Sequence, residues 1–279
     1  MLLYFTHEMV WGGPGRPFDL HPNAYAFTKR PFHETVSSVY ATLIPNTGVF
    51  HGFDYMQELD ALGTKPYHLF LKVAQKLPAE RLYLLLGSLN VKYVNSFRAL
   101  LGGAATPIGS FPEYPAWLYR INRVIPRTHV VSRMIVEEDP LRALDRLSSA
   151  EFDPLTEVVL EQALPLSANK DFNSQAKLLR YTNHHVTIQA SSLNGPGILV
   201  LADTFYPGWR AYVDGKEGKI LRANLFFRGV LLAPGNHRVV FRYEPASFRY
   251  GLIVTLASLL SLLIFFVKGR LAGRRSKSG

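Results

Sequence analysis

Aromatic and polar side chains that could bind a sugar are concentrated in a short segment, residues 203–212. Aromatic rings stack on the C–H bonds of sugar rings, and carboxylate and guanidinium groups fix the hydroxyls by hydrogen bonds. We therefore interpret Asp203, Tyr206, Trp209 and Arg210 as a candidate glycan-binding set. The sequence favours a structural alternative, in which Pro207-Gly208 is a turn, Trp209 fills a core and Tyr212 alternates onto one face.

A second candidate set consists of arginines that precede a long apolar run: Arg222, Arg228, Arg238, Arg242 and Arg249. Cations close to a bilayer are attracted to anionic headgroups. We predict headgroup contacts for Arg242 and Arg249, and for Lys268 at the far end of the run.

Other charged groups are weaker candidates for chemistry. Asp54, Glu58 and Asp60 could act in acid–base catalysis or bind a cation. The favoured interpretation is that they lie on the solvated surface of a helix. His184 and His185 are adjacent, so on a strand they point to opposite faces and cannot chelate one ion. The acidic run at residues 137–139 is better placed to favour the N-terminus of the next helix.

Common motifs for hydrolases, nucleotide binding and zinc are absent from the sequence, and it has no cysteine. We therefore assign no catalytic residue, metal or cofactor to this chain.

The apolar run, residues 251–267, contains no charged residue and no proline. As a helix of about 1.5 Å per residue it reaches roughly 25 Å, which suits a short membrane span. We predict a transmembrane segment over residues 246–268; the alternative is a buried core helix. Thr255, Ser258 and Ser261 share one face, where they either receive other transmembrane helices or bond back to their own helix.

The net charge of +10 invites a nucleic-acid function, but its distribution argues against one. Five of the positive charges follow the apolar run: Lys268, Arg270, Arg274, Arg275 and Lys277. The positive-inside bias makes residues 269–279 a cytoplasmic tail and the rest of the chain extracytoplasmic at the cell membrane. No export signal is visible, so we expect the C-terminal part of a longer polytopic protein, with residues 1–5 as the stub of an earlier span.

The elements that must position these groups indicate an α+β fold. Residues 1–78 are irregular. Residues 79–166 form a small α/β unit, with helices at 78–89 and 141–147 and strands at 91–96, 117–122, 128–136 and 156–161. Residues 175–245 form an antiparallel β-sandwich. Two hairpins are expected in it, at Asp214-Gly215 and at residues 234–236.

Three segments near the C-terminal end resemble one family: residues 204–215 (TFYPGWRAYVDG), 234–237 (PGNH) and 241–245 (FRYEP). Residues 89–93 (LNVKY) and 125–127 (IPR) agree in order, and similarity is weaker over 44–71. Together these segments resemble the C-terminal region of YfhO-like bacterial membrane proteins, which are related to GT-C glycosyltransferases.

The resemblance implies a many-span enzyme that transfers a sugar from a polyprenyl-phosphate carrier outside the cytoplasm. Its catalytic acid lies in an early outer loop that this chain lacks. The chain would then be accessory to glycosyl transfer onto a cell-envelope acceptor, with glycan or polyprenyl-linked sugar as partner. The alternative is a non-enzymatic, membrane-tethered module that binds glycan or protein.

Overall fold

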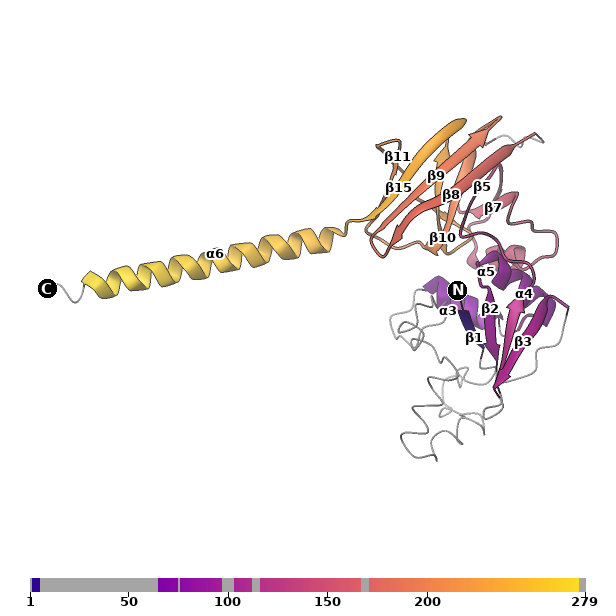
Figure 1. The fold of residues 1–279 in the computed structure, drawn as a ribbon. Helices are drawn as coiled ribbons and strands as arrows, with labels where there is room; N and C mark the ends of the chain where they lie inside the picture. The colour runs from indigo at the N-terminus through magenta and orange to yellow at the C-terminus, as the bar shows by residue number, and fades with distance from the viewer. Residues whose placement is uncertain are drawn as a thin grey trace, which may run out of the picture.

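The protein is described by a computed structural model over residues 2–5, 65–74, 76–96, 103–111, 116–166 and 171–275. It is an α+β fold with one long C-terminal helix, as predicted, and its strands form three sheets (Figure 1). Asp54, Glu58 and Asp60 lie outside the described residues.

The first sheet is small and shares a hydrophobic core with two helices. Its strand order is β1 (Leu2–Phe5), β2 (Tyr93–Ser96), β4 (Ala116–Ile121) and β3 (Ala105–Phe111). The helices are α3 (Lys65–Ala74) and α4 (Ala79–Ser88). Because β1 pairs in parallel with β2, the prediction that the first residues are the stub of a membrane span was wrong.

The second sheet has six strands and forms the middle of the molecule. Its order is β5 (Thr128–Val131), β10 (Gly197–Thr204), β14 (Phe227–Leu232), β13 (Leu221–Ala223), β7 (Glu157–Leu160) and β6 (Arg133–Val136). The segments predicted as an α/β unit and as a sandwich therefore contribute strands to one sheet.

Helix α5 (Pro140–Leu147) connects β6 to the parallel strand β7. Asp139 caps it by accepting hydrogen bonds from the backbone N–H groups of Leu141 and Arg142. Leu144 and Leu147 are buried, whereas Leu141 is 54% exposed. Each three-residue step turns about 60° short of a full circle, so Leu141 lies roughly 120° from Leu147.

The third sheet has five antiparallel strands. Its order is β12 (Lys216–Gly218), β11 (Trp209–Val213), β15 (Gly235–Tyr243), β9 (His185–Leu193) and β8 (Asn173–Thr182). The hairpin at Asp214-Gly215 is confirmed, and both residues have positive φ (51° and 82°).

The second predicted hairpin was wrong. Strand β14 belongs to the six-stranded sheet and β15 to the five-stranded one, so residues 233–234 carry the chain from one sheet to the other. A Pro-Gly link serves a sheet-to-sheet crossing as well as it serves a hairpin, because both need a sharp change of direction.

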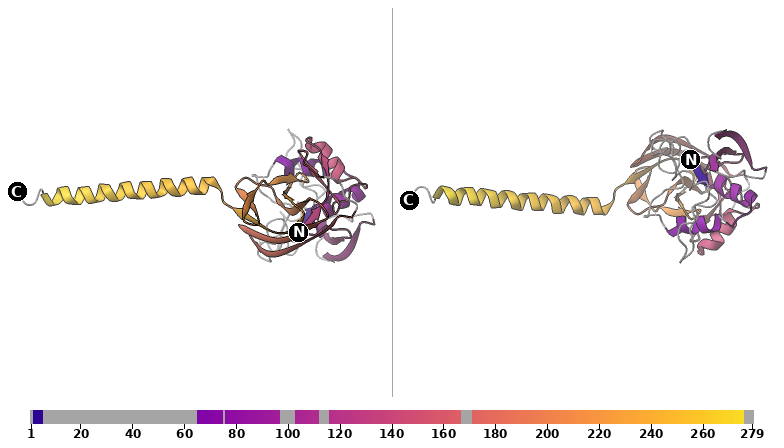
Figure 2. Two further views of the ribbon diagram at one scale, coloured as in Figure 1. Left: turned by 90° about the horizontal axis from the view of Figure 1, so that it is seen from above. Right: turned by 90° about the horizontal axis from the view of Figure 1, so that it is seen from below.

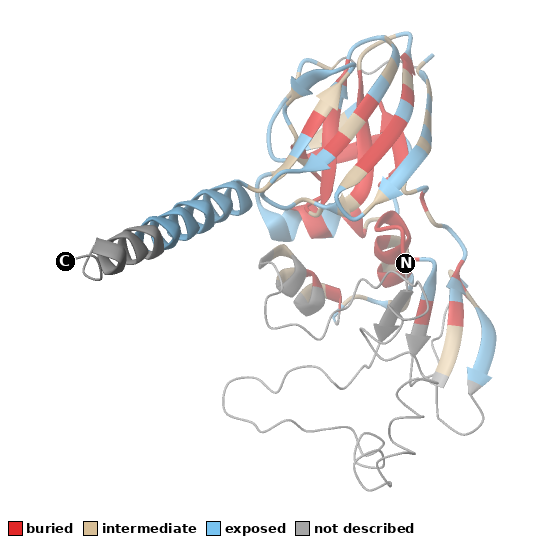
Figure 3. Ribbon diagram, turned by 60° about the vertical axis from the view of Figure 1, so that its left-hand side comes forward, coloured by how far each residue is buried: buried red, intermediate tan, exposed pale blue. Residues whose placement is uncertain are grey.

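The six-stranded sheet is covered on both faces, as the buried residues in Figure 3 indicate. On β10, Ile198 and Val200 join a core with the helices, whereas Leu199 and Leu201 join a core with the five-stranded sheet. This double burial explains why β10 is a continuous apolar run rather than an alternating one.

Helix α6 (Ala246–Arg275) projects away from the folded body (Figures 1 and 2). Over Ala246–Phe265 its mean hydropathy is 1.9 and none of it is buried, so it is not a core helix. Among the described residues it is the one helix whose length and composition suit a membrane span. The hydroxyls of Thr255, Ser258 and Ser261 donate to carbonyl groups one turn back in the same helix.

Candidate functional site at the helix-proximal end of the sandwich

The polar centre of the sandwich is the carboxylate of Asp203, at the end of β10. It is 8% exposed. Its Oδ1 accepts from Arg127 Nε at 3.1 Å and from the Tyr181 hydroxyl at 3.3 Å, and its Oδ2 accepts from Arg228 Nη2 at 2.8 Å. We call these four residues the Asp203 clamp.

Arg228, on β14, is the deeply buried member of the clamp, with 3% of its side chain exposed. Its guanidinium carbon lies 3.8 Å from the centre of the Trp209 ring and 5.3 Å from that of Phe241. Burial lowers its pKa to about 10, although the charge of Asp203 opposes the shift. Arginine therefore stays charged here and is stabilised by one carboxylate and two aromatic faces.

The clamp joins the two sheets at the end from which α6 emerges. Asp203 and Arg228 belong to the six-stranded sheet, and Tyr181 and Trp209 to the five-stranded one. Arg127 lies over the Tyr181 ring at 4.3 Å, which adds a second contact between the layers. Because three donors occupy the oxygens of this carboxylate, it suits a structural tie between the sheets better than proton transfer.

The turn at Pro207-Gly208 closes this end, as predicted. Gly208 has φ +100°, and a Cβ there would lie 2.9 Å from Tyr243 Cε2. Its carbonyl accepts from the Glu244 N–H at 2.7 Å, and the Trp209 and Tyr243 rings are 5.4 Å apart. The turn is therefore fixed against the last residues before α6.

The structure divides the four predicted glycan residues. Asp203 and Trp209 meet in the clamp region, both in contact with Arg228. Tyr206 is exposed in the loop between β10 and β11. Arg210 follows Trp209 on β11, so it points to the opposite face, where it is 3.6 Å from Glu217 and 3.8 Å from Glu244.

The predicted headgroup residues are also separated by the fold. Arg242 is exposed on β15, and Arg249 is exposed in the first turns of α6. Lys268 lies within α6, but its side chain is outside the described part. Arg228, which the sequence groups with the surface arginines, is buried instead.

Sequence reasoning missed Arg127 and Tyr181 as partners of Asp203. They are 76 and 22 positions away along the chain, and no local spacing links them. The IPR segment at residues 125–127 carried part of the family resemblance, and this was the one available signal for Arg127.

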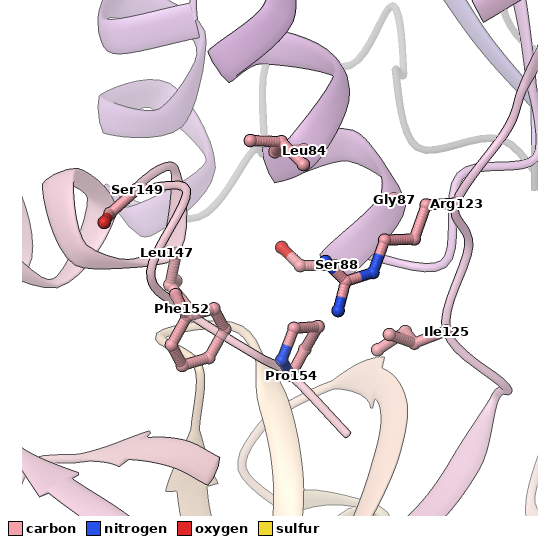
Figure 4. Close-up of a pocket in the computed structure, with 9 residues that line it drawn as sticks. All are labelled: Leu84, Gly87, Ser88, Arg123, Ile125, Leu147, Ser149, Phe152 and Pro154. Carbon is pink, nitrogen blue, oxygen red and sulfur yellow. The ribbon is translucent and has the colours of Figure 1, made fainter. Parts of the chain in front are cut away.

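A crevice elsewhere is a poorer candidate. It is shallow and open to solvent, and it lies where α4 meets residues 123–125 and 147–154 (Figure 4). Its lining is largely apolar, and Arg123 is engaged with Asp153 at 2.8 Å. Among the described residues, no group of three or more His, Asp or Glu side chains could hold a metal ion.

The fold and this end of the sandwich define a class of protein: an α+β domain joined to an apolar helix that supports membrane association. Residues 159–255 match the family model described as bacterial membrane protein YfhO. The chain thus contains a YfhO-like membrane-protein region, which confirms the resemblance predicted from its motifs.

One curated relative is described as uncharacterized protein YfhO of Bacillus subtilis (strain 168). It is 25% identical over 112 residues, which cover 40% of this chain and 13% of that protein. The chain therefore corresponds to a small part of that relative. No solved structure matches the chain.

Proposed function

We propose that the chain is the extracytoplasmic C-terminal part of a YfhO-like, GT-C-related membrane protein. In this role it is accessory to polyprenyl-phosphate-dependent transfer of a sugar to a cell-envelope acceptor. The observation that carries the proposal is the direct joint between the sandwich and the apolar helix, since β15 ends at Tyr243 and α6 begins at Ala246. Three residue steps reach at most about 10 Å, so this end of the sandwich stays near the bilayer surface, where a lipid-linked sugar lies.

The side chains at that end of the sandwich are suited to binding a sugar. Tyr206 is exposed, and the Trp209 and Tyr243 rings, 5.4 Å apart, are partly accessible. Asp203 is not among the groups we assign to sugar, because the clamp already occupies its oxygens. Tyr206 is therefore the aromatic residue best placed to contact a ligand without a cost to the fold.

Membranes that contain the full chain and a photoreactive polyprenyl-phosphate sugar provide the test of sugar contact. We expect covalent labelling within residues 204–212, reduced several-fold by Tyr206→Ala. Tyr93→Ala, which removes another exposed tyrosine far from α6, serves as the matched control. Equal labelling of Tyr206→Ala and the unmodified chain would remove Tyr206 from the sugar site, and no labelling at all would contradict the sugar-binding role.

Orientation is tested separately. The basic residues after the apolar run support a cytoplasmic C-terminus. A reporter fused after Gly279 should be active only on the cytoplasmic side. Activity outside would reverse the orientation and place the sandwich in the cytoplasm.

A second candidate function is a non-enzymatic, membrane-tethered module for glycan or protein. This function is favoured because Asp203 and Trp209 are already in contact with Arg228. Few fixed polar groups therefore remain for chemistry at this end of the sandwich. The neighbouring gene separates the two functions. An upstream polytopic protein with an acidic residue in its first outer loop supports the accessory role, and an unrelated neighbour supports the tethered module.

A further inference from the structure

Positively charged side chains extend along the outer face of the five-stranded sheet, starting at the end that leads into α6. Near that end, Arg210 on β11 lies opposite Arg242 on β15, which lies opposite His185 on β9. Arg180 on β8 lies opposite Thr187, two residues further along β9, and Arg238 on β15 lies opposite Gln189, two residues beyond Thr187. All of these positions share the face that points away from the sandwich core, because residues two apart on a strand lie on the same side.

We call Arg180, His185, Arg238 and Arg242 the basic sheet face. Among the described residues, no carboxylate forms a salt bridge with any of its three arginines, whereas Arg210 beside them has both Glu217 and Glu244. The guanidinium carbon of Arg242 lies over the Tyr212 ring, 5.4 Å from its centre.

The pKa of His185 reflects how close these charges lie to one another. Partial burial lowers the pKa of His185, and the charges of Arg180, Arg242, His184 and Arg238 lower it further. Arginines directly opposite each other across a strand pair, as Arg210 and Arg242 are, also repel. Asp214 lies across from Arg238, but its carboxylate accepts from the Arg238 backbone N–H and is bonded to His237. The outer face of the isolated domain therefore keeps a net positive charge, which an external anion would relieve.

The basic sheet face is continuous with the membrane helix. Arg242 precedes the first residue of α6 by four positions. Phe248 and Tyr250, in the first turns of α6, are 71% and 69% exposed. Aromatic residues at the start of an apolar helix are typical of the headgroup level of a bilayer, so the nearest cations lie within reach of the same layer.

We infer that the basic sheet face docks on anionic phospholipid headgroups of the leaflet that α6 enters, so that the sandwich leans on the membrane instead of standing away from it. This inference requires α6 to be in a bilayer but does not depend on the proposed role in sugar transfer. A soluble polyanion would also neutralise the arginines. The bilayer is the favoured occupant because the covalent joint to α6 holds the face beside it at a high effective concentration.

The lack of cysteine allows a direct test. Gln189→Cys places one fluorescent donor in the row of Arg238 on the same face. The full chain is reconstituted in phosphatidylcholine vesicles, with or without phosphatidylglycerol, that carry a headgroup-linked acceptor. We expect higher energy transfer in the anionic vesicles and a return to the neutral value in high salt, because salt screens such contacts.

The variant that tests the residues is Arg180→Gln with Arg238→Gln and Arg242→Gln. Each surface cation is worth about fivefold in membrane attraction, so the equilibrium constant for docking should fall on the order of 100-fold. The matched control is Arg120→Gln with Arg142→Gln and Arg146→Gln, which removes the same charge from exposed positions outside the five-stranded sheet. It should dock like the unmodified chain, and unchanged circular dichroism should confirm that both variants are folded.

Three outcomes would overturn the inference. Energy transfer could be equal in neutral and anionic vesicles. The control variant could lose it as fully as the test variant. A soluble polyphosphate could shift the fluorescence of the labelled face while the anionic vesicles leave it unchanged, in which case the face binds a polymer and not the membrane.

Discussion

Two sets of arginines in the sandwich differ in what faces them. Arg228 is buried between the sheets, bonded to Asp203 and stacked on Trp209. Arg180, Arg238 and Arg242 are exposed on the outside of the five-stranded sheet, and no described carboxylate forms a salt bridge with them. The buried arginine is matched within the fold and holds the layers together, whereas the exposed arginines leave charge available to something outside it.

The largest expected effect on stability comes from removing Asp203, the carboxylate that pairs with the buried Arg228. Asp203→Ala leaves Arg228 buried without a carboxylate, and breaking a buried pair from one side costs about 3–5 kcal/mol. Glu217→Ala, which removes an exposed partner of Arg210, should cost less than about 1 kcal/mol. Urea unfolding of both variants in detergent measures the difference. Similar losses would contradict the distinction between the two sets.

A buried histidine and an exposed histidine allow the same comparison of buried and exposed groups as a function of pH. Burial lowers the pKa of His129 from 6.5 to about 4, although the carbonyls of Pro126 and Pro154 oppose the shift. Between those values the unfolded chain binds a proton that the folded chain does not, so stability should fall as the pH drops from 6.5 to 4. The loss amounts to about 3 kcal/mol.

The measurement is the free energy of unfolding across that pH window for the unmodified chain and for His129→Gln. The variant should lose this part of the pH dependence. His184→Gln, in the exposed turn between β8 and β9, should keep it. A pH slope that survives in His129→Gln would show that another group causes it.

A smaller effect is expected at the turn that ties the clamp region to α6. Gly208→Ala forces an alanine to φ +100° and drives its Cβ against Tyr243, which should cost about 1–3 kcal/mol. Gly215→Ala is the matched control, because it also has positive φ (82°) but has open space around the added methyl group. Thermal unfolding should show a greater loss for Gly208→Ala, and equal losses would mean that contact with Tyr243 is unimportant.

The smallest effect is expected on the basic sheet face. Arg242→Gln relieves repulsion from Arg210 but loses the contact with Tyr212, so stability should change by less than about 0.5 kcal/mol. The same urea unfolding used for Asp203→Ala provides the check. A loss as large as that of Asp203→Ala would make Arg242 a structural residue and weaken its assignment to the membrane.

Features carried by neighbouring residues were predictable from sequence. The apolar run gives α6, Asp139 caps α5, and Asp214-Gly215 closes a tight hairpin. Each depends on local backbone conformation or on the hydrophobicity of one segment, and consecutive residues determine both. The Pro234-Gly235 link shows the limit, because the same residues suit a hairpin and a crossing between sheets.

The amino-acid sequence by itself determined that this protein has a long apolar helix, a β-rich body and a YfhO-like region. Only the tertiary structure decided that Asp203 meets Arg127 across 76 positions. It also decided that Arg228 is buried while Arg180 and Arg242, from different strands, share one outer face. The reason is physical. Whether an arginine forms an ion pair depends on its neighbours in space, and strand pairing rather than chain order determines which residues those neighbours are.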